Sequence, residues 1–99
     1  MMAGSPGYQS PEQLRSESQG PPSDVYAFSS LMVVLFKQAP LWPGLNFFQI
    51  MHKVTNNEYP NTDGTPESIA VLCKKCFCNV TARLKITEVL KELQEICHF

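Results

Sequence analysis

The chain has 99 residues, of which 43% are hydrophobic and 17% are charged, and its formal net charge is -1. This length allows one domain with a single modest core, and the composition is that of a globular protein, not of a disordered one. The near-neutral charge gives no basic footprint, so we expect neither nucleic acid nor an anionic membrane as a partner. The longest apolar stretch, residues 31–36, falls far short of the roughly 18 residues of a membrane span.

The first residues and the cysteines bear on the cellular compartment. The start of the chain has no positive region followed by an apolar run, so it does not read as a secretory signal. Four cysteines in a chain without such a signal are expected to be reduced thiols. We therefore expect a cytoplasmic, intracellular protein.

Residues 3–22 are rich in glycine and proline and are expected to be mainly loop. A short helix over 11–15 fits within them, because Pro11 suits a first helical turn and Ser10 can cap it.

Residues 23–37 are expected to form a central helix capped by Ser23 or Asp24. The apolar residues follow the helical period on one face and also fill much of the opposite face. A strand over 32–36 is the alternative, since β-branched residues favour strands. The length of the segment and its Ser-Asp start favour the helix, and a helix that is apolar nearly all round belongs inside a larger body.

Three more helices are expected, over 45–57, 66–78 and 86–97, after a proline-bounded loop at 40–44. Asn46 is the expected cap of the first, and Thr65 is the expected cap of the second, with Pro66 in the first turn. The last helix is expected to bury an inward face of Ile86, Val89, Leu90, Leu93 and Ile96. The chain is thus expected to be mostly α-helical, with four to five helices around a buried central one.

Three short stretches, far apart in the sequence, resemble consecutive parts of one family's domain. Residues 4–12, Gly-Ser-Pro-Gly-Tyr-Gln-Ser-Pro-Glu, are similar to the end of a protein kinase activation segment. Residues 23–28, Ser-Asp-Val-Tyr-Ala-Phe, are similar to the start of the central helix of the kinase C-terminal lobe, and residues 76–84 are similar to its late Cys-to-Arg motif. The sequence departs from the family pattern at Ser29, Asn79, Val80 and Leu84.

The resemblance implies that residues 1–99 form part of a protein kinase C-lobe, with no N-lobe. It implies a buried ion pair between Glu12 and Arg83, which would tie the activation-segment end to the late loop. It also implies that Asp24 anchors the catalytic loop and that Ser5 lies in the substrate-binding loop. Because the catalytic loop is missing from this sequence, Asp24 reads here as a helix cap and Ser5 as a turn residue.

The sequence lacks the motifs that phosphoryl transfer needs. That reaction requires a glycine-rich cover over the phosphates, a strand lysine, a base and magnesium ligands. No Gly-x-Gly-x-x-Gly, His-Arg-Asp or Asp-Phe-Gly occurs in the chain. We expect this chain to be a truncated kinase-like domain that by itself is catalytically inactive and binds no cofactor. A complete parent would use ATP and magnesium for serine/threonine phosphorylation.

The alternative function is a pseudokinase-type interaction module, with Trp42 and Phe48 on a surface that binds a protein partner. In a full kinase the central helix is surrounded by parts that this chain lacks. Its apolar face is therefore expected to be incompletely covered, and the chain to be poorly soluble or dependent on a partner.

A zinc site is a further alternative, because thiolates and imidazoles are zinc ligands. The candidates are Cys73, Cys76, Cys78, Cys97, His52 and His98. Against this, Cys73 and Cys76 continue the apolar stripe of their helix, and no second Cys-x-x-Cys closes the site. We therefore expect no bound metal.

Overall fold

A computed structural model of the protein describes residues 8–15 and 20–97, and within these ranges it contains five α-helices and no strand. The helices are α1 (Pro11–Leu14), α2 (Pro21–Lys37), α3 (Phe47–Thr55), α4 (Glu67–Phe77) and α5 (Ile86–Cys97). The expected mostly helical fold is confirmed. The radius of gyration is 12.8 Å, close to the value of about 13 Å for a folded domain of this length.

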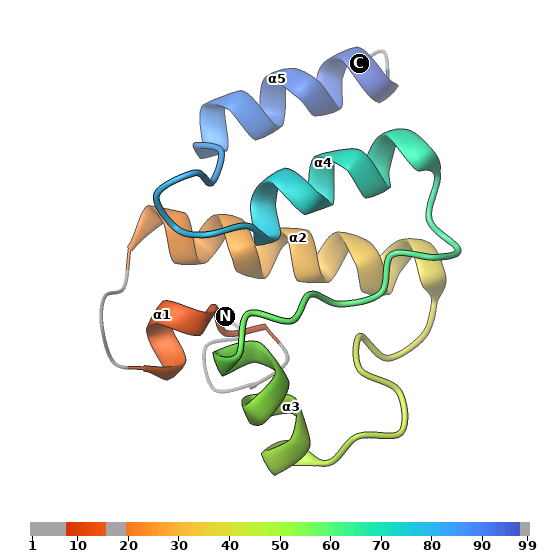
Figure 1. Ribbon diagram of the computed structural model, residues 1–99. Helices are drawn as coiled ribbons and strands as arrows, with labels where there is room; N and C mark the ends of the chain where they lie inside the picture. Colours follow the sequence, from red (N-terminus) through yellow and green to blue (C-terminus); the bar gives the residue numbers. More distant parts are fainter. Residues whose placement is uncertain (1–7, 16–19, 98–99) are drawn as a thin grey trace.

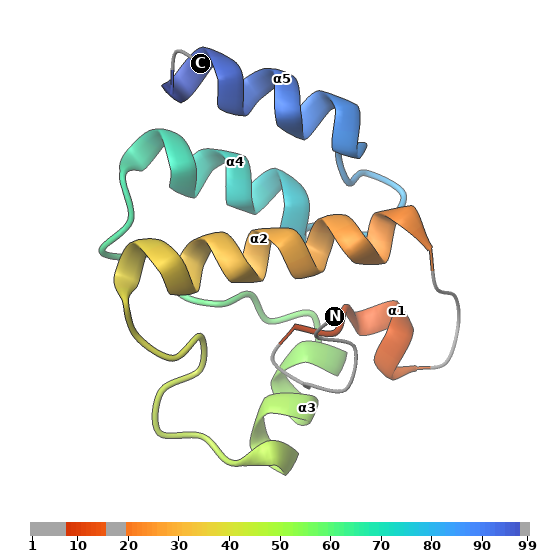
Figure 2. The same cartoon turned by 180° about the vertical axis from the view of Figure 1, so that it is seen from behind.

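The helices lie on two sides of α2, the longest one (Figures 1 and 2). On one side α4 packs against α2, and α5 packs against both. On the other side α3 packs against α1. We call α2, α4 and α5 the core layer, and α1 with α3 the α1–α3 pair.

Most of the buried apolar side chains form one cluster, which is made by the core layer and by Leu41 of the loop after α2. It contains Val25, Tyr26, Met32, Val33, Leu41, Ile69, Leu72, Cys73, Cys76, Phe77 and Val89. Val54 of α3 is fully buried but lies outside this cluster. The two parts of the molecule therefore bury their apolar side chains in separate places.

Two helix starts agree with the sequence. Ser10 and Gln13 form a reciprocal capping box at α1, and Asn46 and Gln49 form another at α3. In each box two backbone N–H groups that the helix leaves unpaired gain an acceptor. Both predicted caps are thus confirmed.

The predicted caps of α2 and α4 are wrong. Helix α2 begins at Pro21 after the N-cap residue Gly20, which has no side chain that could act as a cap, and the two prolines of its first turn have no N–H group. Ser23 is therefore inside the first turn. At α4 the N-cap residue is Pro66, and the hydroxyl of Thr65 donates to the carbonyl oxygen of Thr62, not to the helix.

Two helices leave apolar side chains exposed, as expected for α2 but not for α5. Near the end of α2, Leu35 is 64% exposed and Phe36 is also exposed, in agreement with the expectation that the apolar face of the central helix is incompletely covered. In α5, Ile86 and Leu90 are exposed, whereas Val89 is buried, since α5 lies at the edge of the molecule. Among the described helices, none is long and apolar enough to cross a membrane.

Candidate functional site

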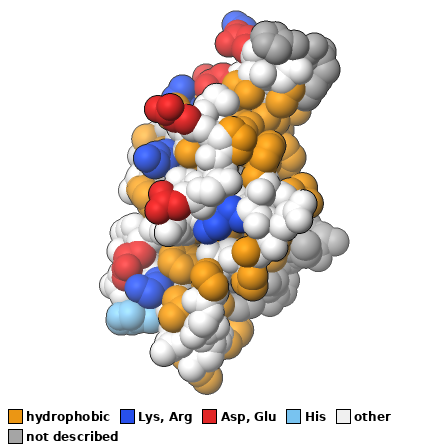
Figure 3. Space-filling model, turned by 90° about the vertical axis from the view of Figure 1, so that its right-hand side faces the viewer, with side chains coloured by type: hydrophobic (Ala, Val, Ile, Leu, Met, Phe, Trp, Pro, Cys, Tyr) orange, Lys and Arg blue, Asp and Glu red, His pale blue; other side chains and the backbone are white. Residues whose placement is uncertain are grey.

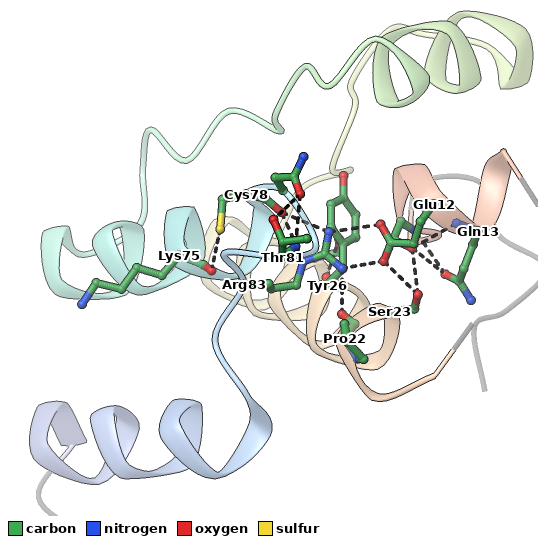
Figure 4. Close-up of polar contacts among 12 residues, drawn as sticks. Glu12, Gln13, Pro22, Ser23, Tyr26, Lys75, Cys78, Thr81 and Arg83 are labelled. Atoms are coloured by element: carbon green, nitrogen blue, oxygen red, sulfur yellow. Dashed lines mark hydrogen bonds and ion pairs between the residues drawn. The ribbon is translucent and has the colours of Figure 1, made fainter. Parts of the chain in front are cut away.

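The two oppositely charged side chains singled out in the sequence meet between α1 and the α4–α5 loop (Figure 4). Arg83 Nη1 donates to Glu12 Oε2 at 2.6 Å, and Nη2 donates to Oε1 at 3.2 Å. The side chains are only 1% and 5% exposed. Two parallel bonds fix both the distance and the orientation of the partners. The pair therefore holds together segments that are 71 residues apart.

The remaining donors of Arg83 bind backbone carbonyls. Nη1 donates to the carbonyl oxygen of Pro22 at 2.9 Å, and Nε and Nη2 donate to that of Cys78 at 3.2 Å and 3.0 Å. A guanidinium has five N–H donors, and each of them has an acceptor here. Arg83 thus joins α1, the start of α2 and the end of α4 at one point.

Two serines complete the network on the side of Glu12. The Ser23 hydroxyl donates to Glu12 Oε2 at 2.9 Å, and the Ser10 hydroxyl donates to the Ser23 hydroxyl at 3.1 Å. Both serines are buried. Ser23, which lies inside the first turn of α2, thus uses its hydroxyl to bind Glu12.

An aromatic ring lies next to the guanidinium. The Cζ atom of Arg83 is 5.2 Å from the ring centroid of Tyr26, within cation–π range. The edge-to-face partner of Tyr26 is Phe77, at 5.1 Å between centroids. The Tyr26 hydroxyl is buried and has no hydrogen-bond partner among the described residues. Burial, the largest cause, raises the pKa of Tyr26, so this hydroxyl stays protonated.

The surroundings of Glu12 keep it ionised. Burial alone would raise the pKa of Glu12, but hydrogen bonds from Arg83, from the backbone and from Ser10 and Ser23 lower it to about 2. The carboxylate is therefore charged at neutral pH and engaged on both oxygens. Such a group is suited to holding segments in place and not to taking up a proton during a reaction.

Of the four residues assigned by resemblance, the structure brings two together. Glu12 and Arg83 are in contact, whereas Asp24 is exposed in the first turn of α2. Its expected role as a helix cap is wrong, as described above. Ser5 lies outside the described residues.

The cysteines are placed as thiols with different access to solvent. Cys73 and Cys76 are buried in the core layer, Cys78 is half-buried and Cys97 is exposed, and all four are free. Burial raises the pKa of Cys73, and it raises that of Cys76 to about 12, which disfavours the thiolate that binds metals. No group of three potential ligands that could hold a metal occurs among the described residues. His98 lies outside them.

The two residues of the expected partner surface differ in burial. Trp42 is half-buried and packs against the core cluster. Its indole N–H is buried without an acceptor among the described residues. Phe48, at the start of α3, is 78% exposed and lines a groove of about 310 Å³ with Leu45, Gln49, His52 and Lys53. Hydrophobic side chains also reach the surface along one side of the molecule among charged ones (Figure 3).

Three members of the network are not assigned to it by the sequence. Ser10 and Ser23 read as helix caps, and Tyr26 reads as part of an apolar face. Their convergence depends on how α1 lies against the start of α2, which a pattern within one segment does not contain. The sequence signal for this network is the resemblance of residues 4–12 and 76–84, which contain Glu12 and Arg83, to parts of one family's domain.

No family model matches the chain, and no curated protein matches it. Its function is therefore inferred from the residues and their geometry.

Proposed function

We propose that the chain is part of a protein-kinase-like C-lobe, running from the end of the activation segment onward, and that it does not transfer phosphate by itself. In a longer product it would contribute to ATP-dependent serine/threonine phosphorylation, with ATP and magnesium held by the missing part. The free cysteines fit an intracellular setting for such a protein.

The buried Glu12–Arg83 ion pair is the observation that supports this proposal. A kinase C-lobe needs a tie between the activation-segment end and the late loop, and the resemblance assigns that tie to these two residues. They form a bidentate pair with almost no exposure. An isolated buried charge is costly, so a pair of this kind requires both segments to be in register.

The proposed lack of activity follows from the chemistry that the chain does not contain. Phosphoryl transfer relies on positioning and on neutralising charge around the phosphates. Glu12, the buried carboxylate of the network, is bound to Arg83 and Ser23. The only aspartates in the sequence are Asp24 and Asp63, and both are exposed.

Nucleotide binding gives the first test. The melting temperature of the purified chain is expected to be the same with and without ATP and magnesium. A rise in melting temperature that saturates with ATP concentration would contradict the absence of a nucleotide site.

The coding sequence tests whether this chain belongs to a complete kinase domain. The transcript upstream of residue 1 is expected to encode a lysine-bearing strand and a catalytic-loop aspartate. An upstream sequence that encodes neither the strand nor the aspartate would contradict the kinase proposal and leave protein binding as the remaining candidate function.

The second candidate function is protein binding through the N-terminal half of α3. It is favoured by the exposure of Phe48 beside the groove and by that of Phe47, whose ring lies 5.4 Å from that of Phe48. Aromatic side chains are common anchors at protein interfaces. Apolar groups that remain exposed in this way also promote self-association when no partner is present.

Sedimentation over a range of protein concentrations tests this candidate. The wild-type chain is expected to self-associate, and Phe48→Ser is expected to reduce this. Leu90→Ser, at an exposed apolar position of α5, serves as the control. A wild-type chain that stays a monodisperse monomer would contradict an exposed binding surface.

A further inference from the structure

The α1–α3 pair buries one apolar side chain that is not part of the main apolar cluster. Val54 is fully buried, yet it does not belong to the apolar cluster of the core layer. Helix α3 packs against α1, whereas α2, α4 and α5 pack against one another. Regions that share few apolar contacts with the main core are those that open locally in native proteins.

Polar bonds connect α1 of the α1–α3 pair to the core layer. Glu12 binds Arg83, and Ser10 binds Ser23. Next to this network is a cavity of about 270 Å³ between α1, the segment after α3 and the end of α4. Arg15, Tyr59 and Cys78 are among its lining residues. Packing at the joint is therefore incomplete, and a cavity deprives its walls of dispersion contacts.

Arg15 links the two members of the pair to each other. Its Nη2 atom donates to the carbonyl oxygen of Thr55 at 2.6 Å and to Asn57 Oδ1 at 3.0 Å, at the C-terminus of α3. A cation is favoured there, because the last carbonyls of a helix carry partial negative charge. Arg15 thus positions α3 on α1, and α3 is expected to follow α1 when α1 moves.

We infer that the α1–α3 pair opens as a unit while the core layer stays folded, and that the Glu12–Arg83 ion pair controls how often it opens. Opening separates Arg83 from Glu12 and lets water reach the space beside Tyr26. The unpartnered hydroxyl of Tyr26 favours the open state, since a buried hydroxyl without a partner is costly. Tyr59, in the segment after α3, lines the cavity together with Phe77, the edge-to-face partner of Tyr26.

The opening therefore changes the position of the α3 surface that carries Phe48. In the closed state the Glu12–Arg83 ion pair holds the α1–α3 pair on the core layer. In the open state the α1–α3 pair moves away from the core layer and carries Phe48 with it, while Arg15 still binds α3. This inference goes beyond the proposed function, because it concerns the isolated chain and requires neither a partner nor a nucleotide.

Hydrogen exchange of the wild-type chain at increasing, sub-denaturing urea tests the inference without any substitution. Amides of α3 are expected to exchange through an opening with a weak urea dependence. Amides of α2 and α4 are expected to need an opening with a strong urea dependence, because global unfolding exposes more surface. If all of these amides follow one common urea dependence, the pair does not open separately and the inference is wrong.

Glu12→Gln then tests the control by the ion pair. The exchange rates of residues 50–57 are expected to rise by roughly 150-fold or more, because Arg83 loses its counter-charge, while the rates in α4 change little. Lys75→Ala, which breaks the exposed pair with Glu92, is the control and should leave α3 unchanged. Equal changes in α3 and α4, or no change in α3, would overturn the inference. If the variant does not fold, the wild-type urea series decides.

Discussion

The core layer and the α1–α3 pair are both helical, but different forces hold them. In the core layer, apolar side chains of α2, α4 and α5 share one buried cluster. The α1–α3 pair is attached through a carboxylate, a guanidinium and two hydroxyls. Apolar contact is roughly proportional to area and tolerates small shifts, whereas a bidentate bond requires one geometry. One side chain can therefore fix the position of the α1–α3 pair, whereas the positions of the core-layer helices depend on many side chains together.

Removing the charge of Glu12 should have the largest effect. Glu12→Gln keeps the size of the side chain but leaves the buried Arg83 without a counter-charge, at a cost of about 3–5 kcal/mol. Urea unfolding is to be followed by far-ultraviolet circular dichroism, which sees all helices, and by the fluorescence of the single tryptophan, Trp42, which packs on the core layer. The dichroism transition is expected to begin at lower urea than the fluorescence transition.

The matched control for this variant is Glu58→Gln. Glu58 forms an exposed pair with Lys53 at 3.2 Å, and such pairs contribute about 0–1 kcal/mol. If Glu12→Gln and Glu58→Gln had equal effects, the buried network would not hold the two parts together.

Truncating one apolar side chain in each part sharpens the contrast. Leu72→Ala in the core layer is expected to cost about 3 kcal/mol and to shift the dichroism and fluorescence transitions together. Val54→Ala in the α1–α3 pair removes two methyl groups, and its effect of about 2 kcal/mol should appear in the dichroism alone. A fluorescence shift of similar size for Val54→Ala would show that the two parts unfold as one.

Acid should weaken the joint before the core layer. The pKa of Glu12 is lowered from 4.5 to about 2 in the folded chain, so its contribution is complete above the unfolded pKa. This contribution, about 3 kcal/mol, is lost as the pH falls from about 4.5 towards 2. The dichroism transition should therefore separate from the fluorescence transition on acidification. The same acid dependence in Glu12→Gln would assign it to another group.

A smaller effect is expected at the aromatic ring beside the joint. Tyr26→Phe removes a buried hydroxyl that has no partner among the described residues, and the free energy of unfolding should rise by about 1 kcal/mol. Tyr59→Phe, at an exposed position, is the control and should change little. A loss of stability in Tyr26→Phe would indicate a hydrogen bond through water.

The sequence predicts the helices better than the way they meet. The apolar period of α4, the capping residues Ser10 and Asn46, and the proline-bounded loop are local features, so they can be read from neighbouring residues. The caps predicted for α2 and α4 are wrong, because the residues at the N-cap positions, Gly20 and Pro66, have no side-chain acceptor.

The residues of the candidate site also differ in how far the sequence predicts their roles. Glu12 and Arg83 can be paired from the sequence only through their place in family-like motifs. The parts played by Ser23 and Tyr26 could not be predicted, because they depend on the approach of α1 to the start of α2. The exposure of Leu90 likewise depends on α5 lying at the edge of the molecule, which its helical period does not reveal.

A double-mutant cycle on the ion pair tests the central claim, that Glu12 and Arg83 jointly hold the α1–α3 pair on the core layer. The variants are Glu12→Gln, Arg83→Met and their combination, and the quantity measured is the opening free energy of α3 from hydrogen exchange. We predict that the double variant is less destabilised than the sum of the single variants by about 2–3 kcal/mol. Effects that add to within about 0.5 kcal/mol would contradict the claim, because independent residues behave in that way.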